Sequence, residues 1–318
     1  MKRFLRDIGL FIVLILVIAV IGDIIVSRGL RKTTIRQYAV WNDIYNGTNL
    51  DNDLVFIGAS SCWAGFNPCV LDTMLGISAY NLGIDGHPWE PCQPLRYNTY
   101  MRYAKKKPNI VAIVIDEGSF DRTYQPYERE QFFPYLWIDD SIVTEVRECM
   151  DLTFLDRYCP MWRYIGYRER IEAGVASFFG KMHANDDGVY KGHRGNTWAW
   201  ERASLTMMDS VLLPYDSEVA EAMLQFIEQR KEEGQNVLLV KVPIYHELQE
   251  RFANKEEMCQ RYDSIAREAD VELIDYWNHP IVQDSIYFCN STHLNRYGAN
   301  IISAQLAHDL DSLKLIDQ

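Results

Sequence analysis

Five short runs of apolar, β-favouring residues, separated by stretches with helical periodicity, constrain the fold of this chain most strongly. The runs occupy residues 54–57, 77–82, 109–115, 236–242 and 271–274, and helical stretches at 91–107, 216–233, 245–269 and 295–313 follow them. Strands that alternate with helices form a parallel sheet that is covered on both faces. We therefore predict an α/β fold, a three-layer doubly wound sheet of five parallel strands in the flavodoxin-like order.

The N-terminus carries the second strong signal. Residues 8–26 are apolar except for Asp23, and three of the first six residues are basic. A run of about 19 residues can cross a bilayer as a helix, and it exceeds the 7–15 apolar residues of a cleaved signal peptide. We predict a signal anchor over residues 1–30 and a stalk over residues 31–52. The early basic residues favour a cytoplasmic N-terminus and a body in the periplasm or on the cell surface, although basic residues also flank the other end.

Between the third and fourth strands, regular patterning stops. Residues 120–214 are rich in aromatic residues and arginine, with short helical pieces at 142–150 and 168–179 and loops at 185–188 and 192–196. So long a connection exceeds what a crossover requires. We predict an α/β domain over residues 53–318 that carries a largely helical insertion at 120–214. Its tryptophans can serve core packing or stack on sugar rings.

Composition excludes several classes of function. The formal net charge is −12, with 32 basic against 44 acidic residues, which argues against a nucleic-acid partner. The seven cysteines include no CxxC pair, and the histidines lack metal-ligand spacing. We therefore predict neither a metal nor another cofactor.

The end of the first predicted strand offers a nucleophile. The run at 54–57 stops at Gly58, and Ser60 follows just before a predicted helix. A serine at the carboxyl end of a parallel strand lies where open α/β sheets bind ligands, near the positive end of the next helix. Ser60 is our candidate nucleophile; the alternative is a helix N-cap, where serine is also favoured.

A serine nucleophile needs a base and donors for the oxyanion. His293 lies in a loop before the last helix and could reach the same sheet edge as Ser60, although it could also be a helix-entry residue bonded to the backbone. Gly83 follows the second strand, and its N–H could be an oxyanion donor.

These residues carry a resemblance to a known family. Gly58-Ala-Ser60, Asn81-Leu-Gly83 and His293 occur in the order and at the strand ends typical of the SGNH/GDSL hydrolase superfamily. The chain resembles in particular its membrane-anchored branch, in which the nucleophile block is Gly-x-Ser. The resemblance implies that Ser60 is the nucleophile and His293 the base, with the amides of Ser60 and Gly83 as oxyanion donors.

Two positions depart from the family pattern. Asn290 stands where the family places an aspartate three residues before the histidine. An asparagine carbonyl can hold the imidazole tautomer but adds no charge; Asp275 or Asp284 might substitute. Asp116-Glu117 stands where the family has an asparagine that helps the oxyanion. A carboxylate there would oppose catalysis, so we expect this pair to serve structure or to bind substrate hydroxyls.

The sequence thus predicts a membrane-anchored serine esterase or O-acyltransferase that acts on small acyl esters of extracytoplasmic glycans. The alternative is a catalytically weak or inactive envelope protein that keeps the fold and binds glycans or partner proteins. The two departures leave both functions open.

Overall fold

The computed structural model describes residues 1–86, 89–122, 128–147, 149–181, 189–202, 205 and 209–316. The chain divides into two compact units, one formed by residues 1–42 and 127–187 and the other by residues 43–126 and 188–318. The predicted boundaries, an anchor, a stalk and an α/β domain with an insertion at 120–214, stay a prediction. Each unit is described by itself.

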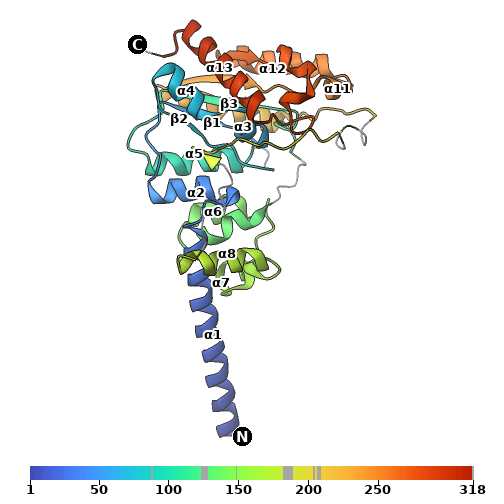
Figure 1. Ribbon diagram of the computed structural model, residues 1–318. Coiled ribbons are helices and arrows are strands. Elements are labelled where there is room, and N and C mark those ends of the chain that lie inside the picture. The colour runs from blue at the N-terminus through green and yellow to red at the C-terminus, as the bar shows by residue number, and fades with distance from the viewer. Residues whose placement is uncertain are drawn as a thin grey trace. The chain divides into compact units, whose positions relative to one another are not determined.

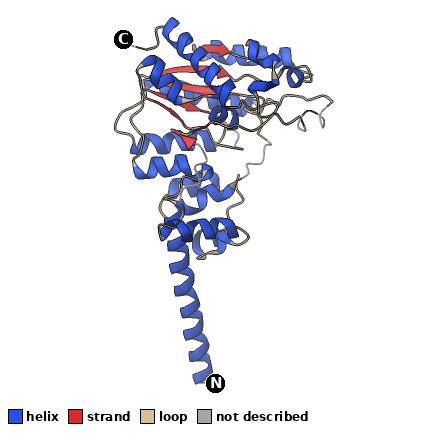
Figure 2. Ribbon diagram, viewed as in Figure 1, coloured by secondary structure: helices blue, strands red, loops and turns tan. Residues whose placement is uncertain are grey.

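The second unit is built on a five-stranded parallel sheet (Figures 1 and 2). Its order is β2-β1-β3-β6-β7, the flavodoxin-like order, which confirms the predicted fold class. The strands are β1 Leu54–Ile57, β2 Ala79–Asn81, β3 Ile110–Ile115, β6 Asn236–Lys241 and β7 Glu272–Asp275. Every residue of the adjacent strands β1 and β3 is buried, as continuous apolar runs require of strands covered on both faces.

Helices cover this sheet on both sides (Figure 2). They are α3 Ser60–Gly65, α4 Pro68–Leu75, α5 Cys92–Tyr103, α10 Ser217–Glu232, α11 His246–Gln249, α12 Lys255–Glu268 and α13 Arg296–Ser312, with short 3-10 helices at Pro280–Gln283 and Ser285–Tyr287. Helix α13 packs against α3 and α4. Helices α5 and α10 meet through Tyr97 and Phe226, whose rings contact each other edge to face with centroids 5.4 Å apart.

One local prediction for this unit was wrong in detail. The segment 192–196, predicted as a loop, contains β5 His193–Arg194, which pairs with β4 Val189–Tyr190 in an antiparallel hairpin. The stretch 245–269, predicted as helical, is mostly helix and contains α11 and α12. The predicted loop at 185–188 lies outside the described residues.

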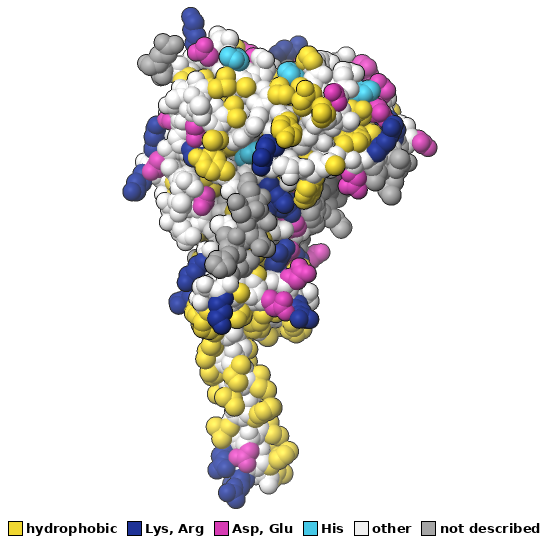
Figure 3. Space-filling model, viewed as in Figure 1, with side chains coloured by type: hydrophobic (Ala, Val, Ile, Leu, Met, Phe, Trp, Pro, Cys, Tyr) yellow, Lys and Arg dark blue, Asp and Glu magenta, His cyan; other side chains and the backbone are white. Residues whose placement is uncertain are grey.

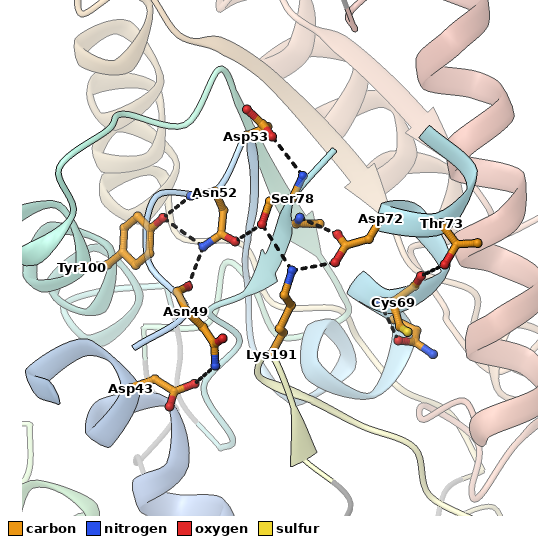
Figure 4. A network of polar contacts seen from close by, with 12 residues as sticks. Asp43, Asn49, Asn52, Asp53, Cys69, Asp72, Thr73, Ser78, Tyr100 and Lys191 are labelled. Atoms are coloured by element: carbon orange, nitrogen blue, oxygen red, sulfur yellow. Dashed lines mark hydrogen bonds and ion pairs between the residues drawn. The ribbon is translucent and has the colours of Figure 1, made fainter. Parts of the chain in front are cut away.

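A network of polar contacts holds this hairpin to the sheet edge (Figure 4). Lys191 Nζ, from the hairpin turn, donates to Asp72 Oδ2 at 2.6 Å and to Ser78 Oγ at 3.2 Å. Ser78 in turn donates to Asn52 Oδ1 at 2.7 Å, and its backbone N–H donates to Asp53 Oδ2 at 2.9 Å. These bonds link α4, the start of β1 and the start of β2, so the hairpin is placed by side chains far from it in sequence.

The first unit is helical. It contains α1 Lys2–Leu30, most of α2 Arg36–Asn46, α6 Asp140–Val146, α7 Phe154–Tyr158 and α8 Arg168–Phe178, with 3-10 helices at Arg129–Tyr135 and Trp162–Tyr164. Within the described residues, α1 is the one helix long and apolar enough to cross a membrane. Apolar side chains are exposed along most of it, with basic residues at its start (Figure 3).

The end of α1 is packed into the first unit. A Cβ on Gly29 would lie 1.7 Å from the carbonyl oxygen of Gly174 in α8, so only glycine permits this approach. Asp23 and Arg163 form a fully buried ion pair, and the Ser27 hydroxyl donates to Asp23 Oδ1 at 3.1 Å. The lone acidic residue of the apolar N-terminal run is therefore paired inside the unit.

Candidate active site

The turn after β1 delivers Ser60 to the carboxyl edge of the sheet. A Cβ on Gly58 would lie 2.6 Å from the Cβ of Cys62 and 2.9 Å from that of Val114, so this strand-to-helix turn requires glycine. Ser60 is the first residue of α3 and is half-buried. Because the first N–H groups of a helix have no intrahelical acceptor, the Ser60 amide is available to a ligand.

Ser60 lines a cavity of about 340 Å³ at this edge. Its polar wall comes from the segment after β3, and its apolar wall from the segment before α10. The lining residues are Ala59, Ser60, Gly86, Asp116, Glu117, Gly118, Ser119, Asp121, Val211, Leu212, Leu213 and Pro214. A polar wall opposite aliphatic side chains suits a small ester with an apolar acyl group.

His293 lies in a tight loop that reaches α3. The backbone N–H of Cys289 donates to the carbonyl of His293 at 2.8 Å, which closes the loop. The His293 ring lies 6.2 Å from the Trp63 ring, centroid to centroid. Trp63 is one helical turn after Ser60, and side chains three residues apart share a helix face. His293 therefore lies beside Trp63 of the helix that Ser60 begins, and the residues that line the Ser60 cavity do not include it.

Asn290 organises this loop. Its side-chain oxygen accepts hydrogen bonds from the backbone N–H groups of Thr292 at 3.1 Å and His293 at 2.9 Å. The same oxygen lies 3.0 Å from His293 Nδ1, and the hydroxyl oxygen of Thr292 also lies 3.0 Å from that nitrogen. A carbonyl oxygen can only accept, so the bond to Asn290 holds the proton on Nδ1 and leaves Nε2 as the basic nitrogen.

The two alternative aspartates have other partners. Asp275 pairs with Lys241 Nζ at 2.6 Å and accepts from the Trp277 N–H, and Asp284 accepts from the Ile286 N–H to cap a 3-10 helix. Asn290, in contrast, contacts the His293 ring directly.

Gly83 is placed differently from the expected oxyanion donor. Its N–H donates to Asn81 Oδ1 at 2.9 Å, and its carbonyl accepts from Arg96 at 2.7 Å. Asn81 also donates to the carbonyls of Cys62 and Phe66, at 2.8 and 2.9 Å, and so fastens the end of α3 to β2. An oxyanion role for Gly83 stays a prediction and would require its bond to Asn81 to open.

Gly86, which was not among the site residues predicted from sequence, lines the cavity with Ser60. It has a φ of +66°, a conformation that favours glycine. The signal for it was present in the sequence, because Asn81-Leu-Gly-Ile-Asp-Gly86 contains two glycines and only the fold shows which one reaches the cavity.

Asp116 has a structural role, as expected. Its carboxylate accepts hydrogen bonds from the hydroxyl of Ser61 at 2.5 Å, the hydroxyl of Ser119 at 3.0 Å and the N–H of Gly118 at 3.1 Å. Ser61 is buried, so the two adjacent serines have different environments: Ser60 faces the cavity and Ser61 anchors the end of β3.

Glu117 differs from its neighbour. The residue is half-buried, but its Oε2 atom is shielded from solvent and has no hydrogen-bond partner among the described residues. Burial, together with the negative charge of Asp116, raises the pKa of Glu117 to about 8, although its own backbone N–H lowers the pKa in part. Burial and the negative charge of Asp116 therefore favour the protonated form of Glu117.

His193 of the hairpin is buried against the same helix. Its Nδ1 lies 2.8 Å from the carbonyl oxygen of Trp63, and burial lowers its pKa to about 4. It is a neutral, buried histidine that packs between the hairpin and α3. Within the described residues, no cluster of His, Cys, Asp or Glu could hold a metal ion.

A second, larger cavity lies along the start of α13. It has a volume of about 960 Å³, and its wall includes Trp198, Trp200, Tyr287 and Tyr297. Trp198 is 60% exposed and Tyr297 62% exposed, so aromatic faces are open to solvent here. Aromatic surfaces of this kind can stack on flat apolar faces of a ligand.

Comparisons with known proteins give a fold likeness alone. No family model matches the sequence, and no curated protein does. Among solved structures, the chain is similar to a family two carbohydrate esterase from Clostridium thermocellum in complex with cellohexaose, with 11% identity and a TM-score of 0.37 over 84% of this chain. An active-site mutant of a family two carbohydrate esterase from the same organism gives 10% identity and a TM-score of 0.38. The chain spans 66% and 65% of those two chains, just under two thirds.

Proposed function

We propose that this chain is a membrane-anchored serine esterase or O-acyltransferase of SGNH type, acting on small acyl esters of extracytoplasmic glycans. The observation that carries the proposal is that Ser60 begins α3 and that His293 contacts Trp63 of the same helix. Ser60 opens the helix and lines a cavity, and the His293 ring lies 6.2 Å from that of Trp63, one turn further on.

In this mechanism Ser60 Oγ attacks the ester carbonyl and gives its proton to His293 Nε2, and the alcohol leaves with that proton. Water or a second hydroxyl then attacks the acyl-enzyme by the reverse proton path. Asn290 holds the imidazole in the required tautomer without adding charge. The amides of Ser60 and Gly86 are the proposed oxyanion donors, with Gly83 as the alternative that the family resemblance implies.

Cavity size supports a small acyl group. A volume of about 340 Å³ is at the lower end of the range for ligand pockets, roughly 300–1,000 Å³. We therefore expect acetyl esters to be cleaved faster than octanoyl esters of the same alcohol.

The test uses the full chain in detergent micelles and a fluorophosphonate probe, which labels activated serines. We expect Ser60→Ala to abolish labelling. Ser61→Ala is the matched control, because this adjacent serine is bonded to Asp116 instead of facing the cavity; it should still label. Equal labelling of wild type and Ser60→Ala, or the absence of labelling in both, would refute the assignment.

The proposed anchor is supported by the packing of α1. Asp23 and Val26 are buried in the first unit, so cleavage after the apolar run would remove residues that the unit uses. We expect the protein to stay in the membrane fraction after alkaline extraction, and an N-terminal tag to resist external protease. Release by alkali, or digestion of the tag, would contradict the anchor or its orientation.

A binding function is the second candidate, and the aromatic cavity along α13 favours it. A carbohydrate array separates the two. Glycan binding that survives Ser60→Ala and is lost in Trp198→Ala, without esterase activity in wild type, would favour the binding protein.

A further inference from the structure

The first unit exposes large apolar side chains at a high density, even without counting α1. Among the described residues, nine such side chains are exposed in the segment 128–181, and nine are exposed in the whole second unit, which is several times longer. Contiguous apolar patches are rare on monomeric soluble proteins, and where they occur they mark a contact with a protein, a ligand or a membrane.

Contacts with Asp23 fix the level of part of this apolar surface along α1. The backbone N–H of Met161 donates to Asp23 Oδ2 at 2.8 Å, and Arg163 forms the buried ion pair with the same carboxylate. Trp162 lies between these two residues in sequence and is 43% exposed. Ile165, whose N–H donates to the Trp162 carbonyl at 3.0 Å, is 66% exposed. Both exposed side chains therefore lie near the level of Asp23.

Further contacts continue this surface to α7. The Arg163 guanidinium lies over the Trp137 ring, 4.4 Å from its centroid. The Trp137 indole N–H donates to the carbonyl of Arg157. The adjacent Tyr158 ring lies 4.6 Å from the Phe154 ring, centroid to centroid, and both rings are more than half exposed. The exposed side chains form an aromatic surface that consists of Trp137, Phe154, Tyr158, Trp162 and Ile165.

The apolar run of α1 is long enough to bring the aromatic surface to the edge of a bilayer. The basic residues Lys2, Arg3 and Arg6 precede the run, and Ile24 is its last exposed large apolar side chain. A helix needs about 20 residues to cross a hydrocarbon core of about 30 Å. Counted from Arg6, the core ends close to residue 26, and Asp23 lies within about 5 Å of that edge at a rise of about 1.5 Å per residue. This is the level at which hydrocarbon gives way to headgroups.

We propose that the aromatic surface of the first unit inserts into the headgroup region of the bilayer that α1 crosses. The inference rests on the membrane anchor proposed above and gives the unit a second contact with the same membrane. Aromatic side chains are enriched at membrane–water boundaries, where tryptophan and tyrosine rings sit among the headgroups. Within the first unit, α7 and α8 lie beside α1 where it leaves the unit, and hydrophobic side chains gather along this margin (Figures 1 and 3).

Continuity with α1 favours lipid over a protein partner as the occupant of this surface. Ile21 and Ile24 are 52% and 36% exposed on α1 on either side of Asp23, and they face lipid when the helix crosses a bilayer. A protein partner would have to displace that lipid to cover the aromatic surface at the same level. Lipid covers both surfaces without such displacement.

The first experiment uses tryptophan fluorescence of the full chain in phosphatidylcholine vesicles. Lipids with acyl chains brominated close to the headgroup quench tryptophans that lie at this depth, and unbrominated vesicles give the reference. Because Trp162 is one of the two tryptophans of the aromatic surface, Trp162→Phe should lower the quenched fluorescence by about half. Trp41→Phe is the matched control, because the Trp41 ring is fully buried in the same unit; it should leave the quenched fluorescence unchanged.

The second experiment changes the surface itself. Phe154 and Ile165 are each 66% exposed, so substitutions there leave the packing of the unit intact. The double variant Phe154→Glu with Ile165→Glu places two carboxylates among the headgroups and should lower the quenching of the remaining tryptophans at least twofold. Phe154→Leu with Ile165→Leu keeps both positions apolar and should quench as wild type does.

Two outcomes would overturn the proposal: equal quenching in wild type and Trp162→Phe, or equal quenching in the two double variants. A dimer that forms through this surface and leaves Trp162 unquenched would assign it to a second copy of the chain instead. Alkaline extraction of the same vesicles separates this proposal from the anchor. A chain that is retained but shows no quenching of Trp162 refutes the docking alone, whereas a chain that alkali releases refutes the anchor.

Discussion

The side-chain oxygen of Asn290 lies 3.0 Å from Nδ1 of His293, at the position where the hydrolases that the sequence resembles have an aspartate. The same oxygen also accepts a hydrogen bond from the backbone N–H of His293 at 2.9 Å, so Asn290 holds both the backbone and the ring of this histidine. It lacks the negative charge that stabilises an imidazolium. In the proposed mechanism, Asn290 therefore orients the imidazole without adding the charge that an aspartate would supply.

We predict that Asn290→Asp raises activity. The aspartate can make the same contacts, and the reverse change in a serine protease lowers turnover by about 10⁴, as the standard example of such a triad documents. We expect at least a tenfold rise in kcat for acetyl ester hydrolysis, measured on the full chain in detergent.

Asn290→Ala is the control for that experiment. It removes the acceptor for the N–H groups of Thr292 and His293 as well as for the ring, so activity should fall below that of wild type. A rise in Asn290→Ala, or no change in Asn290→Asp, would show that this position does not orient His293.

The contact between α1 and α8 should depend on glycine. A Cβ on Gly29 would collide with the Gly174 carbonyl, whereas one on Gly9 of the same helix meets nothing within 4 Å. We predict that Gly29→Ala destabilises the first unit by about 1–3 kcal/mol or more, as overpacking does. Thermal unfolding in detergent measures the effect.

Gly9→Ala is the matched control for the helix contact. Alanine is the better helix former by up to about 1 kcal/mol, so this variant should be neutral or slightly more stable. Equal stability of the two variants would mean that α1 does not pack on α8 as described.

His193 should make the protein sensitive to acid. Burial lowers its pKa from 6.5 to about 4, so the unfolded state binds a proton that the folded state does not. Stability is therefore full above pH 6.5 and is lost as the pH falls towards 4, by up to about 1.4 kcal/mol per pH unit and about 3 kcal/mol in all.

The variant His193→Gln tests this linkage. Its amide can still donate to the Trp63 carbonyl but does not titrate between pH 4 and 6.5, so urea unfolding across that range should show a smaller loss of stability. His246→Gln, at a partly exposed histidine in α11, is the control and should retain the wild-type slope. An unaltered slope in His193→Gln would mean that His193 is not buried as a neutral ring.

The sequence by itself determined the sheet and the start of the site. Continuous apolar runs such as 54–57 and 110–115 can be buried on both faces only in a parallel sheet, so strand number and order followed from the spacing of helices between them. Gly58 and Ser60 followed in the same way, because a residue's place at a strand end is a local property.

Contacts between distant segments were decided by the tertiary structure alone. The hairpin at 189–194 has strands of two residues, too short for a periodic pattern, and Lys191 and His193 hold it against α4 and α3. Gly83 and Gly86 both follow β2 and look alike in sequence. In the structure, the Asn81 side chain accepts the N–H of Gly83, whereas Gly86 lines the cavity. Glu117 is an acid like Asp116 in sequence, but Asp116 accepts from three donors, whereas Oε2 of Glu117 has no hydrogen-bond partner among the described residues.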